Sequence, residues 1–275
     1  MPKLYASTTC LGGRSYAETI DAYRTAGIDA VELGYCHDTG FDVGTLVTQC
    51  SFDLTAHNYF RPVPEEFVLN IASQDDSLRQ RSVEYVRDSI DFCAQHEIDR
   101  YTFHAGFRAD PDENLRFDTA ELSPVLPCME TFVDSLETLV PYAERRGVSV
   151  AIENNVVEPR HLTDEGSVVL LADPTEFEML FDRIEIDVLL DIGHLKVAAE
   201  TLDFDAEEFL DIVTPQVSHI HLHTNDGTHD AHQPVRPGCW AFDVWKRFND
   251  TPTTVEARFD TLEELIEYRH RLIEH

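Results

Sequence analysis

Lysine is almost absent from this sequence, and basic residues in general are few. The chain of 275 residues contains 21 basic and 52 acidic residues, a formal net charge of −31, and only Lys3, Lys196 and Lys246 supply lysine. Proteins that bind nucleic acid normally need a clustered basic face for the phosphates, so this composition disfavours nucleic acid as a partner. Dense carboxylates with arginine preferred to lysine are instead typical of a halophilic surface, because strong salt screens their mutual repulsion.

Long apolar runs and paired cysteines are also missing. No apolar stretch approaches the ~20 residues that cross a bilayer, which disfavours a membrane protein. Residues 1–13 lack the basic flank and apolar segment of a signal peptide, so we expect a cytoplasmic protein. The absence of any C-x-x-C pair disfavours a zinc ribbon and a disulfide scaffold. We expect free, buried thiols at Cys10, Cys36, Cys50, Cys93, Cys128 and Cys239.

Short β-rich segments alternate with amphipathic segments along the whole chain. This alternation predicts a parallel sheet whose strands are joined by helices. The predicted strands cover residues 3–8, 30–35, 52–57, 100–105, 148–154, 187–193, 217–223 and 253–259. The predicted helices cover residues 15–27, 76–96, 129–147, 175–183, 206–213, 242–248 and 261–275.

Eight such units fit one α/β domain, a single (β/α)₈ TIM barrel over residues 1–275, because this fold usually needs about 250 residues. A doubly wound open sheet is the alternative. It is disfavoured because no G-x-G-x-x-G follows a predicted strand and no G-x-x-x-x-G-K-[ST] loop occurs.

Metal-capable side chains occur where a TIM barrel carries its functional residues, at the carboxyl ends of strands and in the loops that follow. The segment 218–232, SHIHLHTNDGTHDAH, alone holds five histidines and two aspartates. Imidazoles and carboxylates suit divalent cations such as Zn²⁺, Mn²⁺ or Co²⁺. The pattern therefore predicts a metal centre, with candidate residues His57, His104, Glu153, Asp191, His194, His221, Asp230, His232 and Glu256.

Several candidates have a structural alternative. His219, His221 and His223 alternate along one strand and face the same side; we predict His221 as the ligand, His219 deeper in the core and His223 at the loop. Glu153 ends a nearly apolar strand, where a buried charge is costly unless it is paired or coordinated. Glu256 could instead pair with Arg258, since both face one side of a strand.

Seven short motifs, in this order, resemble the xylose isomerase-like TIM barrels, a superfamily of sugar phosphate isomerases and epimerases that also includes endonuclease IV. The motifs are TAH (55–57), FHAG (103–106), IEN (152–154), LDIGH (190–194), HLHTND (221–226), D-x-H (230–232) and VE (255–256). For an isomerase or epimerase, the resemblance implies that Glu153, Asp191, His221 and Glu256 bind metal. It also implies that the catalytic residues Glu153 and Glu256 move the proton.

The endonuclease branch implies three zinc ions on nine ligands, and all nine candidate positions hold a matching residue type. Ligand number therefore does not separate the two activities. Two departures favour the sugar-converting activity: after D-x-H the family usually has Gly-Glu-Gly, whereas this chain has Arg236-Pro237-Gly238, and no basic loop for DNA is visible.

We accordingly expect a sugar or sugar phosphate isomerase or epimerase that acts by proton transfer through a metal-stabilised enediolate. The alternative is an endonuclease IV-like AP endonuclease. The expected cofactor is Zn, Mn or Co, with one to three ions per chain. His57, His104 and His194 would bind substrate or a further metal. The sequence leaves the oligomeric state open, a homo-oligomer included.

Overall fold

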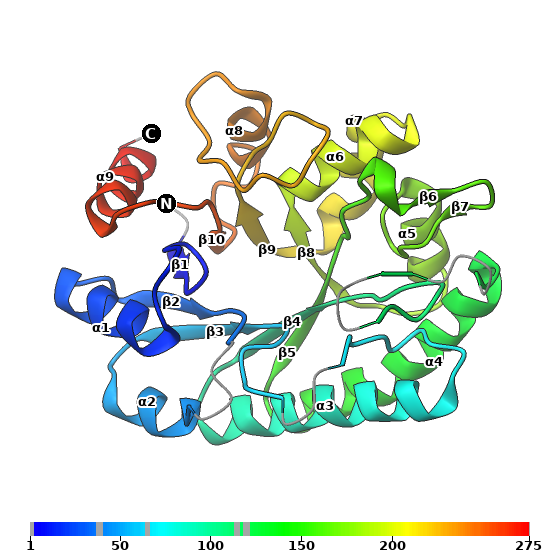
Figure 1. Ribbon diagram of the computed structural model, residues 1–275, viewed down its shortest axis with the longest axis horizontal. Coiled ribbons are helices and arrows are strands. Elements are labelled where there is room, and N and C mark those ends of the chain that lie inside the picture. Colours follow the sequence, from blue (N-terminus) through cyan, green and yellow to red (C-terminus); the bar gives the residue numbers. More distant parts are fainter. Residues whose placement is uncertain (1–2, 37–40, 64–66, 113–115, 118–121, 275) are drawn as a thin grey trace.

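A computed structural model describes residues 3–36, 41–63, 67–112, 116–117 and 122–274. Eight parallel strands form a closed barrel that helices surround (Figure 1). The barrel strands, in their order around the ring, are β1 (Leu4–Ser7), β2 (Ala30–Leu33), β3 (Asp53–His57), β4 (Arg100–His104), β5 (Ser149–Glu153), β8 (Asp187–Asp191), β9 (Val217–Leu222) and β10 (Thr253–Val255). Pairing of β10 with β1 closes the ring. The predicted TIM barrel is confirmed, and the doubly wound alternative is wrong.

All seven predicted helices are present, although α4 begins at Val125 rather than at residue 129. Residue 275, the last of the predicted helical residues, lies outside the described part. The helices are α1 (Tyr16–Ala26), α2 (Val43–Gln49), α3 (Asp76–Gln95), α4 (Val125–Glu144), α5 (Pro174–Phe181), α6 (Ile192–Leu202), α7 (Ala206–Val213), α8 (Trp240–Trp245) and α9 (Leu262–Ile273). A small hairpin, β6 (Leu162–Thr163) with β7 (Gly166–Ser167), lies between β5 and α5.

The first helix illustrates why the outer helices form where they do. Ser15 and Glu18 form a reciprocal capping box at the start of α1, and Gly27 ends the helix with a positive φ of 73°. The buried residues of α1 are Tyr16, Thr19, Ile20 and Tyr23, which follow the helical repeat and face the barrel.

All eight barrel strands are shorter than predicted, by one to four residues, and two of these corrections change the backbone at the predicted site. The strand predicted over 187–193 ends at Asp191, because the Asp191 carboxylate accepts the backbone N–H of His194 at 2.7 Å and starts α6. The strand predicted over 253–259 ends at Val255. Beyond it Glu256 still donates its backbone N–H to Leu222 of β9 at 3.3 Å, whereas Arg258 donates to the carbonyl of His232 in the loop after β9 at 2.8 Å, so the strand pairing gives way to contact with a loop.

Two elements were not predicted as helices. In α2 the sequence VGTLVTQ is rich in β-branched residues of modest helix propensity, and the Asp42 side chain caps it through the N–H of Gly44. In α6 the apolar sequence continues from β8 without a break, which concealed the change from strand to helix.

The cysteines are free thiols, as expected. Four are buried, whereas Cys50 and Cys239 are half-buried, so burial is less complete than predicted. None of the described helices is long and apolar enough to cross a membrane.

Candidate metal centre

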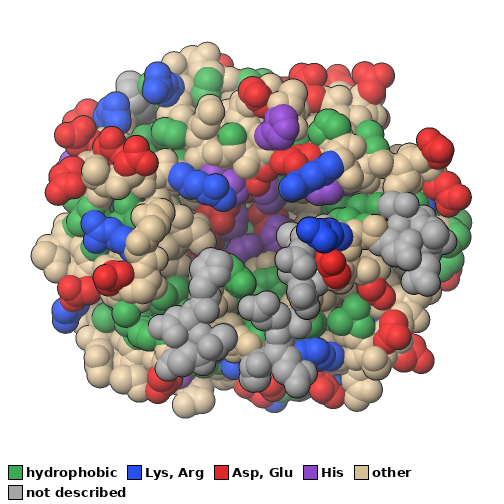
Figure 2. All heavy atoms as spheres, in the orientation of Figure 1, with side chains coloured by type: hydrophobic (Ala, Val, Ile, Leu, Met, Phe, Trp, Pro, Cys, Tyr) green, Lys and Arg blue, Asp and Glu red, His purple; other side chains and the backbone are tan. Residues whose placement is uncertain are grey.

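The nine candidate residues meet at the carboxyl end of the barrel, where Figure 2 shows histidine and acidic side chains in a central hollow. Five of them lie on barrel strands, namely His57, His104, Glu153, Asp191 and His221. The other four lie just beyond strand ends: His194 in the first turn of α6, Asp230 and His232 in the loop after β9, and Glu256 directly after β10.

Of the four residues expected to form the main site, three surround an imidazole nitrogen of the fourth, His221. His221 Nδ1 lies 3.2 Å from Glu153 Oε1, 3.8 Å from Asp191 Oδ2 and 3.4 Å from Glu256 Oε2. Three carboxylates, on β5, on β8 and directly after β10, thus converge on one point. Glu256 also approaches His232 Nδ1 at 3.7 Å and forms no ion pair with Arg258, so the alternative pairing is wrong.

A second group shares the Glu153 carboxylate. Glu153 Oε2 lies 3.4 Å from His57 Nε2 and 3.1 Å from His104 Nδ1. The other nitrogen of His57 lies 2.9 Å from the Thr102 hydroxyl, which fixes the orientation of the ring. Glu153 therefore stands between the second group and the main site.

The third group is arranged around Asp230. Its Oδ2 lies 3.4 Å from His194 Nε2 and 2.9 Å from His232 Nε2. The unpredicted member is His223, which is fully buried, with Nδ1 3.7 Å from Asp230 Oδ1 and Nε2 2.8 Å from Asp191 Oδ2. The alternation of His219, His221 and His223 places His223 on the same side as His221. Because His223 was expected to lie at the loop, only His221 was predicted as a metal ligand.

Glu32 on β2 is a second residue that the sequence prediction missed. It is fully buried, its two carboxylate oxygens lie 3.0 and 3.1 Å from His221 Nε2, and Thr254 donates to it at 3.0 Å. Glu32 lies between Val31 and Leu33 in the segment AVEL, so the argument used for Glu153, that a buried charge is costly unless it is paired or coordinated, applies to it as well.

The donor set fits a divalent cation. Five buried polar atoms of the cluster have no partner that meets hydrogen-bond geometry: Glu32 Oε1, His104 Nδ1, Glu153 Oε2, His223 Nδ1 and Asp230 Oδ1. A buried polar atom without a partner is costly, and metal coordination would supply one. The potential ligand atoms of Glu153, Asp191 and His221 lie within 4.8 Å of one another, and the same holds within the second and third groups. Glu256 meets this limit in two other sets, one with Glu32 and His221 and one with Asp191 and His223. Ligand atoms that each lie about 2.0–2.2 Å from one cation are separated from one another by comparable distances.

The electrostatics of the cluster favour a positive charge at its centre. Burial opposes protonation of His221, yet the carboxylates of Glu32, Glu256 and Glu153 raise its pKa well above the ordinary value. Burial would raise the pKa of Glu256, but His221 lowers it below the ordinary range, so this carboxylate is ionised. Burial lowers the pKa of His57 to about 3, which leaves its ring neutral, as a metal ligand must be.

This chain belongs to the xylose isomerase-like TIM barrel family, which matches residues 20–268. An uncharacterized protein of Methanocaldococcus jannaschii is 25% identical over 179 residues, 65% of this chain and 61% of that protein. A second uncharacterized protein of the same organism is 24% identical, and the alignment spans 53% of it. The chain thus matches somewhat more than half the length of these relatives.

Solved structures share the fold over nearly the whole chain. A D-tagatose 3-epimerase-like protein superposes with a TM-score of 0.71 and 18% identity, covering 99% of this chain and 96% of that one. A family 2 AP endonuclease from Brucella melitensis superposes with a TM-score of 0.65 and 16% identity, covering 94% and 93%. Similarity at this level of identity establishes the fold.

Proposed function

We propose that this protein is a divalent-metal-dependent isomerase or epimerase of sugars. The observation that carries the proposal is the meeting of Glu153 and Glu256, whose carboxylates lie 3.2 and 3.4 Å from His221 Nδ1. Two carboxylates that face one small space can remove a proton from a bound molecule and return it. The similarity in fold to an epimerase-like protein agrees with this chemistry.

Glu153, Asp191, His221 and Glu256 would hold the principal cation, and His223 lies close enough to Asp191 to take part. When bound, the cation supplies Lewis-acid polarisation of a carbonyl group, which acidifies the adjacent C–H. The groups around Glu153 and Asp230 would hold further ions or contact substrate.

The chain's own residues divide the remaining tasks. Glu256 borders a cavity of about 770 Å³ at the barrel mouth and removes the proton next to the carbonyl through a carboxylate oxygen. Glu153 is almost completely buried and returns the proton, on the opposite face of the same carbon for epimerisation or at the neighbouring carbon for isomerisation. His104 is the most accessible histidine of the second group and binds a substrate hydroxyl.

Deuterium incorporation tests this proposal. Wild-type protein incubated with a ketose in D₂O should introduce deuterium at the carbon next to the carbonyl, detected by NMR. Glu153→Gln and Glu256→Gln keep the side-chain size but remove a base, so each should lower the exchange rate by ~10²–10⁴-fold. Glu208→Gln, at an exposed position of α7, is the matched control. Product formed without any deuterium in the wild type would argue against proton transfer through solvent-exchangeable carboxylates.

A zinc-dependent AP endonuclease is the second candidate, because all nine positions expected for that activity fall into adjacent groups. Elemental analysis close to three zinc ions per chain, together with cleavage of abasic-site DNA in high salt, would favour it over the isomerase.

A further inference from the structure

The cavity next to Glu256 is bordered by two arginines. Its described lining comes from the loop after β1, from Tyr16 and Tyr35, and from the segments that carry His232 and Glu256. Arg14 and Arg258 complete the lining, and Glu256 is the only carboxylate among the described residues that form it. Figure 2 shows basic side chains around the hollow that holds the histidines. The mouth therefore combines a metal-binding floor with a positively charged rim.

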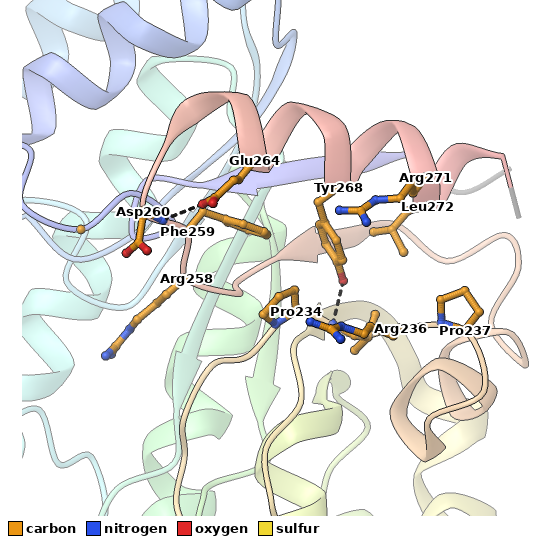
Figure 3. Close-up of a pocket in the computed structure, with 12 residues that line it drawn as sticks. Pro234, Arg236, Pro237, Arg258, Phe259, Asp260, Glu264, Tyr268, Arg271 and Leu272 are labelled. Carbon is orange, nitrogen blue, oxygen red and sulfur yellow. Dashed lines mark hydrogen bonds between the residues drawn. The ribbon is translucent and has the colours of Figure 1, made fainter.

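Both guanidinium groups are available to a ligand. Arg14 and Arg258 are exposed, and within the described part of the chain neither guanidinium forms a hydrogen bond or an ion pair. Arg258 also borders an adjacent cavity of about 500 Å³, but its side chain extends away from α9 and from Arg236 and Arg271 (Figure 3).

Arg258 lies two residues beyond Glu256, so their Cα atoms are at most ~7 Å apart. The backbone N–H of Glu256 donates to Leu222 in β9, that of Arg258 donates to His232 in the loop after β9, and both residues border the same cavity. A ligand whose middle lies at Glu256 can therefore reach Arg258 with a substituent at its end. Arg258 also follows β10, the eighth strand of the barrel, and the loops after strands seven and eight frequently bind phosphate in this fold.

We propose that Arg14 and Arg258 bind a phosphate monoester at the end of an open-chain sugar, which makes the substrate a sugar phosphate. This inference rests on the proposed function and specifies its substrate class. A dianion approaching a chain of net charge −31 meets general repulsion, which local guanidinium groups offset. The planar fork of arginine also matches phosphate oxygens in pairs.

Calorimetric titration at fixed ionic strength tests the site, with D-ribulose 5-phosphate and D-ribulose as probes. Wild-type protein in its metal-loaded form should bind the phosphorylated probe at least ~10-fold more tightly. Arg14→Gln and Arg258→Gln should each weaken binding of the phosphorylated probe by ~10–100-fold, the range for a lost charge-assisted hydrogen bond, and should leave binding of D-ribulose unchanged. Arg183→Gln is the charge-matched control, because Arg183 is exposed and lies just before β8, at the opposite end of the barrel. It should keep the wild-type preference.

The outcomes separate this inference from the proposed function. The phosphate site is overturned if the wild type does not bind the phosphorylated probe more tightly. It is also overturned if both arginine variants keep the wild-type preference. Deuterium exchange into D-ribulose under either of those outcomes leaves the proposed function standing. A preference that depends on Arg14 and Arg258, without exchange into either probe, supports the phosphate site and argues against the isomerase.

Discussion

Glu32 and His221 form a fully buried pair in which the carboxylate oxygens lie 3.0 and 3.1 Å from His221 Nε2. This contact fixes the ring so that Nδ1 faces the carboxylates of Glu153, Asp191 and Glu256. A metal-binding histidine commonly donates its other ring N–H to a carboxylate, which orients the ring and strengthens the ligand. Glu32 therefore holds the His221 ring in place from its Nε2 side, opposite the carboxylates that Nδ1 faces.

Replacement of Glu32 tests this role. Glu32→Gln keeps the shape and one acceptor but removes the charge, so we expect metal affinity to fall by ~10–100-fold while the barrel remains folded. Competition with a chelator of known affinity measures the change, and circular dichroism verifies the fold. Glu208→Gln serves as the control at an exposed position. Equal metal affinity of Glu32→Gln and wild type would show that Glu32 does not influence metal binding by His221.

Gly193 tests whether His223 belongs to the metal centre. A Cβ atom at Gly193 would lie 2.0 Å from His223 Cε1 and 2.3 Å from its Nδ1, so Gly193→Ala must displace this ring. Alanine otherwise favours a helix over glycine, so a loss is attributable to the displacement. We expect a lower metal content by elemental analysis. Gly12→Ala, whose added Cβ meets nothing within 4 Å, should keep the wild-type content.

A full metal content in Gly193→Ala would mean that His223 is only a hydrogen-bond partner of Asp191. His221 would then be the single ligand from β9, as the sequence had suggested.

The sequence predicted the barrel, and most of the residues that the structure brings together in the candidate site, for a physical reason. Strand ends are readable from apolar runs, and a charged residue at such an end, as at Glu153 or Asp191, stands out against its neighbours. The depth of a side chain inside the barrel is not readable in this way. His221 and His223 differ by one step along the same face, and their separate contacts depend on how β8 and β9 are staggered, including the irregularity near Leu189.

Salt should stabilise the folded chain if its acidic surface is halophilic. At a net charge of −31, a fall in ionic strength lengthens the screening distance from ~3 Å at 1 M to ~30 Å at 0.01 M. Repulsion between surface carboxylates then acts over the whole molecule, so we expect the unfolding temperature to drop. Thermal scans by circular dichroism across this range measure the change. A constant unfolding temperature would contradict the halophilic interpretation.

Glu176 should make stability depend on pH independently of the metal centre. It is buried on α5 and accepts the backbone N–H of Ala172 at 3.1 Å. Burial, assisted by the charge of Asp173, raises its pKa from 4.5 to about 7. The folded state therefore binds a proton that the unfolded state releases between pH 4.5 and 7. The contribution of this group is greatest below pH 4.5 and is lost as the pH rises to about 7.

Glu176→Gln mimics the protonated form at every pH. Its stability relative to wild type should increase between pH 5 and pH 8, by up to about 3 kcal/mol at ~1.4 kcal/mol per pKa unit. Urea unfolding at both pH values measures the difference. Glu178→Gln, at an exposed position of the same helix, removes the same charge and should show little change with pH. A pH-independent difference for Glu176→Gln would mean that the Glu176 carboxyl does not titrate in this interval, and that the buried acceptor is ionised throughout.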